Sequence, residues 1–386
     1  MVMDKNTYEL FSEYIIDGVK KEMSPCELLR ECMEVPSDGK PAECSTEKSV
    51  VVDERLDIPP YGRNYSQDKI NEYISSAAVK EKNAGHFDLY HPESHTKKRI
   101  AFTLTETLWK EGHFSLADLS IVLKWNWDPS PTGNMAAFYH SAASASQYLY
   151  DLGVTLGSYE FVRSTGKCSI EAAASLNTRK ETDCTDCESS MTAEQAIGKK
   201  IISDSRICPS KAIPVKDSWL IYIPFDTCQF KLGGSAFSYG NGQKGGTAPD
   251  ISDPDYFIDC FEVVRELIED GIIVSGVSVA EGGIAAAISS ICSDCGINMD
   301  LSGIEYAYGE KDKVRILFSE IPGIIIQIYD TDYDYVDAQL LLQDIAYYPL
   351  GHPDHTCGIE ISSFNRSDVS GILAALMSGQ SPEGED

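Results

Sequence analysis

The sequence predicts an α/β (α+β) protein built from layers of helix and sheet, because expected strands and helices alternate along the chain. Short apolar runs bounded by polar or glycine-containing stretches predict buried strands, and longer segments with apolar residues three or four apart predict helices. The expected strands are Leu116–Trp127, Tyr159–Val162, Ser169–Ala174, Trp219–Ile223, Ile272–Val279, Val314–Phe318, Gly323–Ile328 and Ile359–Ser362. The expected helices lie at 8–19, 70–74, 100–108, 134–152, 255–267, 284–291, 333–344 and 368–376.

The length of 386 residues, with a polar stretch near the middle, predicts two domains that each bury a core. We expect an N-terminal helical or loop extension over 1–60 and a first domain over 61–176. A polar connecting segment follows over 177–215, then a second domain over 216–378 and a polar tail over 379–386.

The formal net charge of -28 at pH 7 argues against nucleic-acid and anionic-membrane partners, because their negative surfaces would repel the chain. No apolar run reaches the roughly 18 residues needed to span a bilayer. The first residues lack the basic-then-apolar pattern of a secretory signal, which favours a cytoplasmic protein. In that compartment the 12 cysteines are expected as reduced thiols.

Two glycine-containing stretches are candidate anion-binding loops. Gly233, Gly234 and Ser235 follow an apolar strand, and glycine lets backbone amides approach a phosphate. Gly282 and Gly283 open an expected helix, where unpaired amides suit an anion. A tight turn at the first stretch and close helix–sheet packing at the second are the alternatives, and both stay open.

Other motifs are interpreted as structural. The pairs Cys184/Cys187 and Cys292/Cys295 lie much further apart than the roughly 15–20 residues usual for a zinc site, so zinc is not expected. An exposed polar loop is a better interpretation than a metal site for three nearby histidines: His86, His91 and His95. Two tryptophans on one expected strand, Trp125 and Trp127, point the same way and are expected in a core or interface.

Several motifs in order resemble the second synthetase half of phosphoribosylformylglycinamidine synthase, in the aminoimidazole ribonucleotide synthetase-like superfamily. The stretch 232–236 reads LGGSA, as in that family. STGKCSI at 164–170 resembles PTGKDSLSM, and FSEIPGIIIQI at 318–328 resembles FAENPGIVIQV. The resemblance covers roughly 100–365 and implies N-terminal and C-terminal domains of the aminoimidazole ribonucleotide synthetase-like fold.

The resemblance also implies an activity and a site. The family uses ATP, magnesium and ammonia to convert a formamide into an amidine in purine biosynthesis. The resemblance assigns nucleotide or phosphate binding to Lys167, Gly233, Gly234, Ser235, Gly282 and Gly283, and metal binding to Glu106.

Polar positions of the family pattern are altered in this chain. The family's metal ligands include the Glu and Asn of EALTN and the Asp of HDxSxGG. Glu106 keeps the first, but Lys110 replaces the Asn and Ser278 replaces the Asp. Val277 and Ala280 replace the His and Ser of the second motif. Because Mg²⁺ prefers carboxylate and other oxygen ligands, these changes predict weakened metal binding.

Two functional hypotheses follow. The first is a component of a split synthase, which needs a companion half and a glutaminase subunit. The second is a degenerate half with weak or no independent ligase activity, used for nucleotide binding or protein interaction. Because single-half relatives pair with a second copy, a homodimer or a complex with a companion half is expected.

Overall fold

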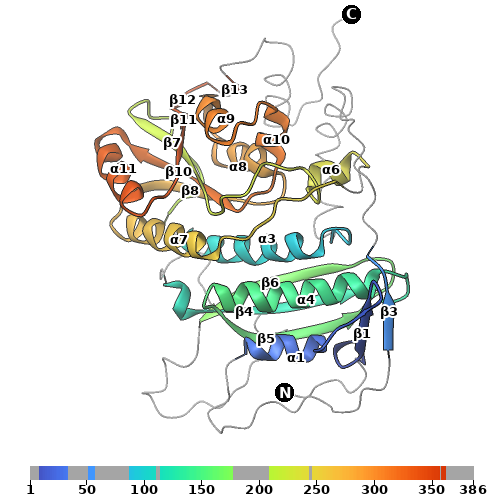
Figure 1. Ribbon diagram of the computed structural model, residues 1–386. Helices are drawn as coiled ribbons and strands as arrows, with labels where there is room; N and C mark the ends of the chain where they lie inside the picture. Colours follow the sequence, from blue (N-terminus) through green and yellow to red (C-terminus); the bar gives the residue numbers. More distant parts are fainter. Residues whose placement is uncertain are drawn as a thin grey trace, which may run out of the picture. The chain divides into compact units, whose positions relative to one another are not determined.

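The computed structural model describes residues 8–33, 51–56, 87–109, 114–176, 208–242, 246–356 and 358–361 (Figure 1). The chain forms two compact units. Unit 1 contains residues 1–59, 85–107 and 114–204, and unit 2 contains residues 60–84, 108–113 and 205–386. The expected helices at 70–74 and 368–376, the segment 177–207 and the tail 379–386 lie outside the described residues.

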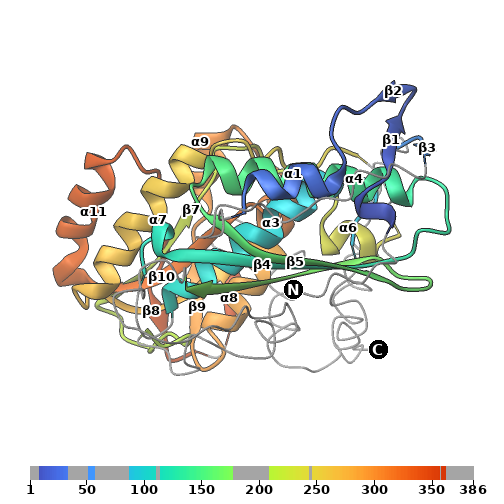
Figure 2. The same cartoon turned by 90° about the horizontal axis from the view of Figure 1, so that it is seen from below.

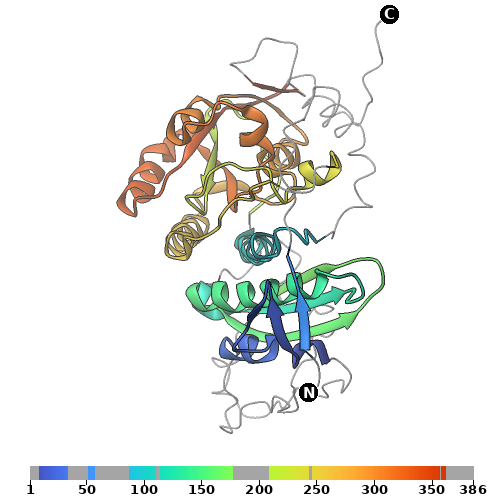
Figure 3. The same ribbon diagram turned by 45° about the vertical axis from the view of Figure 1, so that its right-hand side comes forward.

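Unit 1 is built on a three-stranded sheet with β4 in the middle. Strand β4 (Leu119–Trp127) pairs in parallel with β5 (Thr155–Arg163) and antiparallel with β6 (Ser169–Leu176). Helices α3 (Pro92–Thr105) and α4 (Asn134–Asp151) pack against each other, and α3 also contacts β6. Figures 1 and 3 show α4 running along the sheet. The 3-10 turn η3 (Glu106–Trp109) follows α3, and its last two residues belong to unit 2. The 3-10 turn η4 (Leu116–Asp118) precedes β4.

The indole rings of β4 confirm their predicted place in a core. Trp125 and Trp127 are fully buried. Trp125 donates a hydrogen bond to Ser141 Oγ over 2.9 Å, and Trp127 donates to the Asn134 carbonyl over 2.8 Å. Each ring therefore buries its apolar area while its N–H keeps a partner on α4.

The N-terminal segment corrects the helix expected at 8–19. A 3-10 turn η1 (Tyr8–Leu10) is followed by the hairpin strands β1 (Glu13–Ile16) and β2 (Val19–Lys20), and β3 (Val51–Glu54) pairs in parallel with β1. Asp17 and Gly18 both have positive φ, at 53° and 79°, which closes a two-residue hairpin. That Asp-Gly turn signal outweighs the helical spacing of the aromatic residues.

Helix α1 (Pro25–Glu31) completes the described part of this segment. Ser24 accepts from the Glu27 backbone N–H, and the Glu27 carboxylate accepts from the Ser24 backbone N–H, which is a capping box. The helix packs against α4, and Leu29 is fully buried. Cys26 is disulfide-bonded, so the expectation of reduced thiols throughout is wrong at this residue.

Unit 2 contains a four-stranded antiparallel sheet in the order β11-β7-β10-β8. Its strands are β7 (Ser218–Pro224), β8 (Ile273–Val279), β10 (Gly323–Tyr329) and β11 (Tyr348–Gly351). The second sheet contains β9 (Gly296–Met299), β12 (Pro353–Asp354) and β13 (Ile359–Ile361). The helices are α6 (Ala236–Gly240), α7 (Pro254–Glu269), α8 (Gly283–Ile291), α9 (Ser302–Tyr308), α10 (Lys313–Phe318) and α11 (Tyr333–Leu342). The turn η6 (Asp330–Asp332) precedes α11.

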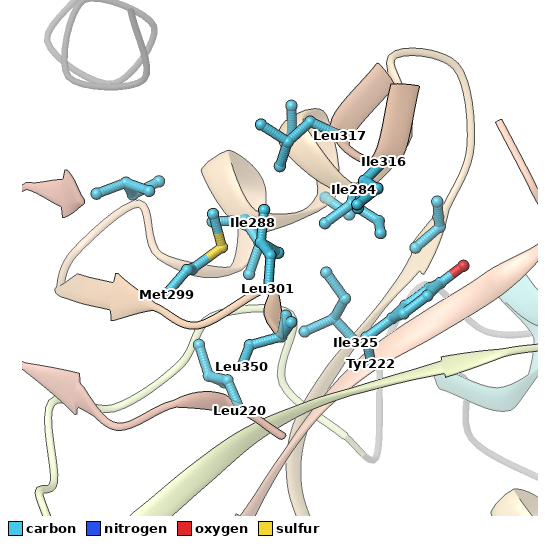
Figure 4. Close-up of a cluster of buried hydrophobic side chains, with 14 of the residues drawn as sticks. Leu220, Tyr222, Ile284, Ile288, Met299, Leu301, Ile316, Leu317, Ile325 and Leu350 are labelled. Atoms are coloured by element: carbon cyan, nitrogen blue, oxygen red, sulfur yellow. The ribbon is translucent and has the colours of Figure 1, made fainter. Parts of the chain in front are cut away.

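The core of unit 2 lies between the four-stranded sheet and the helices α8 and α10. Figure 4 shows side chains from β7 and β10, such as Leu220 and Ile325, facing Ile284, Ile288 and Leu317 from the helices. All five are fully buried. Burial of this apolar area is the main term that stabilises the unit.

One expected strand in unit 2 is wrong. Residues 313–318 form helix α10 instead of a strand. The Asp312 carboxylate accepts a hydrogen bond from the Val314 backbone N–H over 3.0 Å, so it caps the helix. A short apolar run does not by itself distinguish a buried helix from a buried strand.

Within the described residues, no helix is both long and apolar enough to cross a bilayer.

Candidate functional site

The loop at residues 232–235 is shaped by close contact between two stretches of backbone. Gly233 N–H donates to the Thr247 carbonyl over 3.0 Å. A Cβ atom on Gly233 would lie 2.4 Å from the Thr247 carbonyl carbon, so a larger residue does not fit. Gly234 has a φ of 68°, which favours glycine for a second reason. The two glycines are therefore explained by the path of the chain.

Ser235 begins helix α6. Its hydroxyl accepts from the Ser238 backbone N–H over 3.1 Å and donates to the Leu232 carbonyl over 2.7 Å. Its side chain is almost fully buried. Ser235 is thus an N-cap residue, which uses both hydrogen-bonding capacities of the hydroxyl inside the protein.

Glu320 links the starts of two helices. Its Oε1 atom accepts from the backbone N–H of Ala236, at the start of α6, over 2.8 Å. The same atom accepts from the N–H of Gly282, at the start of α8, over 3.0 Å. A carboxylate is stabilised there because helix N-termini carry unpaired amides and partial positive charge. Sequence reasoning missed this role, although Glu320 lies in the matched FSEIPG stretch.

The pair Gly282–Gly283 also has a packing explanation. Gly283 has a φ of 65°, and its Cβ would lie 2.5 Å from the Ser319 carbonyl oxygen and 2.6 Å from that of Leu317. Its N–H donates to the Ala280 carbonyl over 2.9 Å. The backbone amides of Gly233, Ser235, Gly282 and Gly283 all have partners within the chain. Their role in phosphate binding therefore stays a prediction.

Strand β8 contains Ser278, where the sequence resemblance implies an Asp. Ser278 is buried, and its Oγ accepts a hydrogen bond from Trp109 Nε1 over 2.9 Å. Trp109 is fully buried and belongs to unit 2. A Cβ on Gly276 would lie 2.2 Å from the indole ring, so the ring packs directly on the strand backbone. Sequence reasoning missed Trp109, although a glycine inside a strand signals such a close approach.

Lys167 lies in unit 1, in the turn between β5 and β6. Its side chain is exposed, and its carbonyl accepts from Ser164 Oγ over 2.5 Å. The preceding Gly166 has a φ of 76° and donates its N–H to Asp128 Oδ2 over 2.6 Å. The N–H groups of Gly166 and Ser130 hold the pKa of Asp128 below its usual range. The turn is thus fixed by a carboxylate while the Lys167 ammonium stays accessible.

The metal site implied by the family does not fit the donor atoms of this chain. Glu106 is half-buried at the end of α3, and Lys110 lies outside the described residues. The Ser278 hydroxyl is neutral and already bonded to an indole. Among the residues that the structure describes, no three His, Cys, Asp or Glu side chains are grouped to hold a metal ion. Magnesium prefers carboxylate oxygens, which Ser278 does not supply.

The remaining cysteine motif is a buried pair. Cys292 ends α8 and Cys295 precedes β9; both are free thiols and almost fully buried. Their mutual hydrogen bond and burial raise the pKa of Cys292, and the same bond lowers that of Cys295. Cys184 and Cys187 lie outside the described residues. Zinc binding therefore gains no support from the described pair.

The histidine cluster corrects the expectation of an exposed loop. His91 precedes α3, its side chain is largely buried, and its Nδ1 atom lies 2.6 Å from Asp88 Oδ2. His95 lies inside α3, with its ring 4.7 Å from that of Phe87. His86 lies outside the described residues. The two described histidines pack at the start of helix α3. The sequence did not indicate this helix start because it contains few apolar residues.

Comparison with known proteins gives similarity to phosphoribosylformylglycinamidine synthases. The chain is 24% identical over 283 residues to the probable phosphoribosylformylglycinamidine synthase, chloroplastic/mitochondrial, of Arabidopsis thaliana, and 23% identical over 227 residues to phosphoribosylformylglycinamidine synthase of Homo sapiens. The matches cover 71% and 56% of this chain but only 18% and 15% of the relatives. The chain thus spans less than a fifth of these relatives. No protein-family model matches it.

Solved structures give the same result for the fold. T. maritima PurL complexed with FGAR superposes with a TM-score of 0.53 at 11% identity, covering 78% of this chain and 46% of that one. T. maritima PurL complexed with ADP gives a TM-score of 0.50 at 13% identity, covering 78% and 43%. The likeness confirms the predicted aminoimidazole ribonucleotide synthetase-like fold. The chain is a diverged protein similar to one segment of phosphoribosylformylglycinamidine synthase.

Proposed function

We propose that this chain is a phosphoribosylformylglycinamidine synthase-like half that keeps the scaffold and has little or no independent ATP-dependent ligase activity. The observation that carries the proposal is the hydrogen bond from Trp109 Nε1 to Ser278 Oγ. At the position where the family has a metal-binding carboxylate, this chain has a buried, neutral hydroxyl that an indole already uses.

The loss of charge at Ser278 weighs heavily because of the chemistry that the family performs. Phosphoryl transfer depends almost entirely on positioning and on neutralising the developing charge. Both tasks need carboxylates that hold magnesium against the phosphates. Neither Ser278 nor the indole of Trp109 supplies such a ligand. The fold and the loops remain, so a structural or weak nucleotide site is the function that best fits them.

The proposed ligand is ATP, because the family and the relative solved with ADP share this fold. In unit 2, the ligand would meet the loops at Gly233–Ser235 and at Gly282–Gly283. The amides of Gly233, Ser235, Gly282 and Gly283 are bonded within the chain, so phosphate binding would have to use other donors or break these bonds. We therefore expect weak ATP binding that does not depend on magnesium.

The proposed partner is a companion synthetase half, with a second copy of this chain as the alternative and a glutaminase as a further subunit. This proposal rests on the resemblance to one synthetase half, which in that family works together with a second half and a glutaminase. Light scattering at micromolar concentration tests the second copy, because a monodisperse monomer would exclude a stable homodimer.

Calorimetry and an ADP-release assay test the lack of activity. We expect no ADP release above background when the chain is given ATP, magnesium, formylglycinamide ribonucleotide and ammonia. Titration with ATP, with and without magnesium, should give the same weak binding. Magnesium-dependent turnover by the chain alone would refute the proposal, and turnover only with a companion half would instead identify a split enzyme.

Two matched variants sharpen this test at Ser278. Ser278→Asp restores the family's carboxylate, and Ser278→Asn has the same shape without the charge. Each is combined with Trp109→Thr, which places the residue of the family's EALTN motif at 109. We expect magnesium to strengthen ATP binding only in the aspartate variant. Thermal unfolding must first show that each variant folds, because Trp109 is fully buried.

A further inference from the structure

Helix α11 and the turn before it present an apolar face to solvent. Leu341 and Leu342 are 63% and 76% exposed, and Tyr335 is 45% exposed. Val336 and Leu340, on the opposite side of the helix, are fully buried. Figures 1 and 2 show α11 beside α7 at the edge of unit 2. Single exposed apolar residues are ordinary, but several on the exposed side of one helix indicate a candidate interaction site.

The turn before α11 and the helix itself are acidic. Residues 329–344 contain five Asp residues and no Lys or Arg. Asp330, in the turn before α11, and Asp334, in its first turn, are exposed, and Tyr329 at the end of β10 is 39% exposed. We call this set the acidic–aromatic surface: Tyr329, Asp330, Asp334, Tyr335, Leu341 and Leu342.

Contacts around the helix hold this surface in place. The Asp330 N–H donates to the Asp217 carbonyl over 3.0 Å, and the Ala346 N–H donates to the Tyr256 hydroxyl oxygen over 2.9 Å. The Tyr347 hydroxyl donates to the Asp337 carboxylate. A surface that is ordered before binding loses less conformational entropy when a partner docks.

Charge decides which partner fits. Carboxylates attract Lys and Arg, and exposed tyrosine rings bind cations through their faces. A second copy would bring the same acidic surface and a net charge of -28, so it would be repelled. We propose that the acidic–aromatic surface docks a basic segment of another protein, in which Leu or similar apolar side chains alternate with Lys or Arg.

The test uses a defined probe and the full chain. A fluorescein-labelled helical peptide with leucines three and four residues apart and lysines between them is titrated in fluorescence anisotropy. A second peptide has serine in place of every leucine and the same charge. We expect the leucine peptide to bind at least about tenfold more tightly than the serine peptide, because the apolar side chains add to the charge attraction.

Variants of the chain locate the binding. Leu341→Ser with Leu342→Ser should weaken binding of the leucine peptide about tenfold and leave the serine peptide unaffected. Asp330→Asn with Asp334→Asn should weaken both peptides and reduce the dependence on salt. The matched control, Glu31→Gln with Asp151→Asn, removes two exposed charges from unit 1. It should leave the binding of both peptides unchanged.

Three results would overturn the proposal. The first is equal binding of both peptides or no binding of either. The second is equal loss in the control and surface variants, which would show attraction to net charge alone. The third is a wild-type dimer in sedimentation that Leu341→Ser with Leu342→Ser dissociates, since the occupant would then be a second copy.

Discussion

The glycine loops of unit 2 and strand β8 respond to different constraints. At Gly233 and Gly283 a Cβ would meet backbone atoms at 2.4–2.6 Å, so the chain path itself demands glycine. On β8, Gly276 and Ser278 contact a side chain, that of Trp109. Backbone cannot move aside without changing the fold, whereas a side chain can be exchanged together with its neighbours.

This difference agrees with the sequence resemblance, which is complete at LGGSA and incomplete on β8. The LGGSA stretch forms a turn and a helix cap that contacts within the chain explain. On β8, where the resemblance implies a carboxylate, Ser278 instead accepts a hydrogen bond from Trp109, which lies outside the strand. The glycine motifs are therefore evidence about the fold of this chain, whereas the side chain at 278 bears on its proposed chemistry.

The largest expected loss of stability comes from adding a methyl group at Gly283, where backbone atoms leave no space for it. Gly283→Ala should lower the free energy of unfolding by about 2–5 kcal/mol, because it adds a steric clash to the cost of a left-handed backbone. Denaturant unfolding measures the loss.

Gly271→Ala is the matched control for that experiment. Gly271 has a φ of 71° but nothing within 4 Å of its Cβ position. Gly271→Ala should lower the free energy of unfolding by only about 1–2 kcal/mol, because alanine is strained in the left-handed conformation. Equal losses at the two positions would show that the backbone contact at Gly283 contributes nothing.

A smaller effect is expected on β8, where the neighbour is a side chain. Gly276→Ala should cost about 1–3 kcal/mol, because the methyl group overlaps the Trp109 ring. In a double-mutant cycle with Trp109→Leu, the two changes should couple by at least about 0.5 kcal/mol, since the smaller side chain makes room for the methyl group. Additive losses would contradict the packing of the indole on the strand.

The smallest expected change in stability concerns Asp128, which holds the turn that contains Lys167 in unit 1. The pKa of Asp128 is depressed by N–H groups of Gly166 and Ser130, so its charged form favours the folded state. That stabilisation is present above the unfolded pKa and is lost as pH falls through the folded pKa. Below about pH 4, wild type should lose stability more steeply than Asp128→Asn. Parallel curves from denaturant unfolding at pH 3 to 7 would contradict this role.

Much of the fold followed from the sequence because its elements carry local signals. The apolar run at Trp219–Ile223 predicted β7, and apolar spacing with a closing glycine predicted α7 and α4. Errors fell where two local signals compete. The aromatic spacing at 8–19 hid an Asp-Gly hairpin turn, and the apolar run at 313–318 fits helix or strand equally well.

The site depended on contacts between residues that are far apart in the chain. Sequence alone determined that a serine lies at 278, where the resemblance implies a carboxylate, and that glycines lie at 233 and 283. Only the tertiary structure decided that Trp109, 169 positions away, bonds to Ser278, and that Glu320 joins the starts of two helices. Spacing along the chain reports neighbours one or two turns away, whereas long-range pairing is set by how the elements pack.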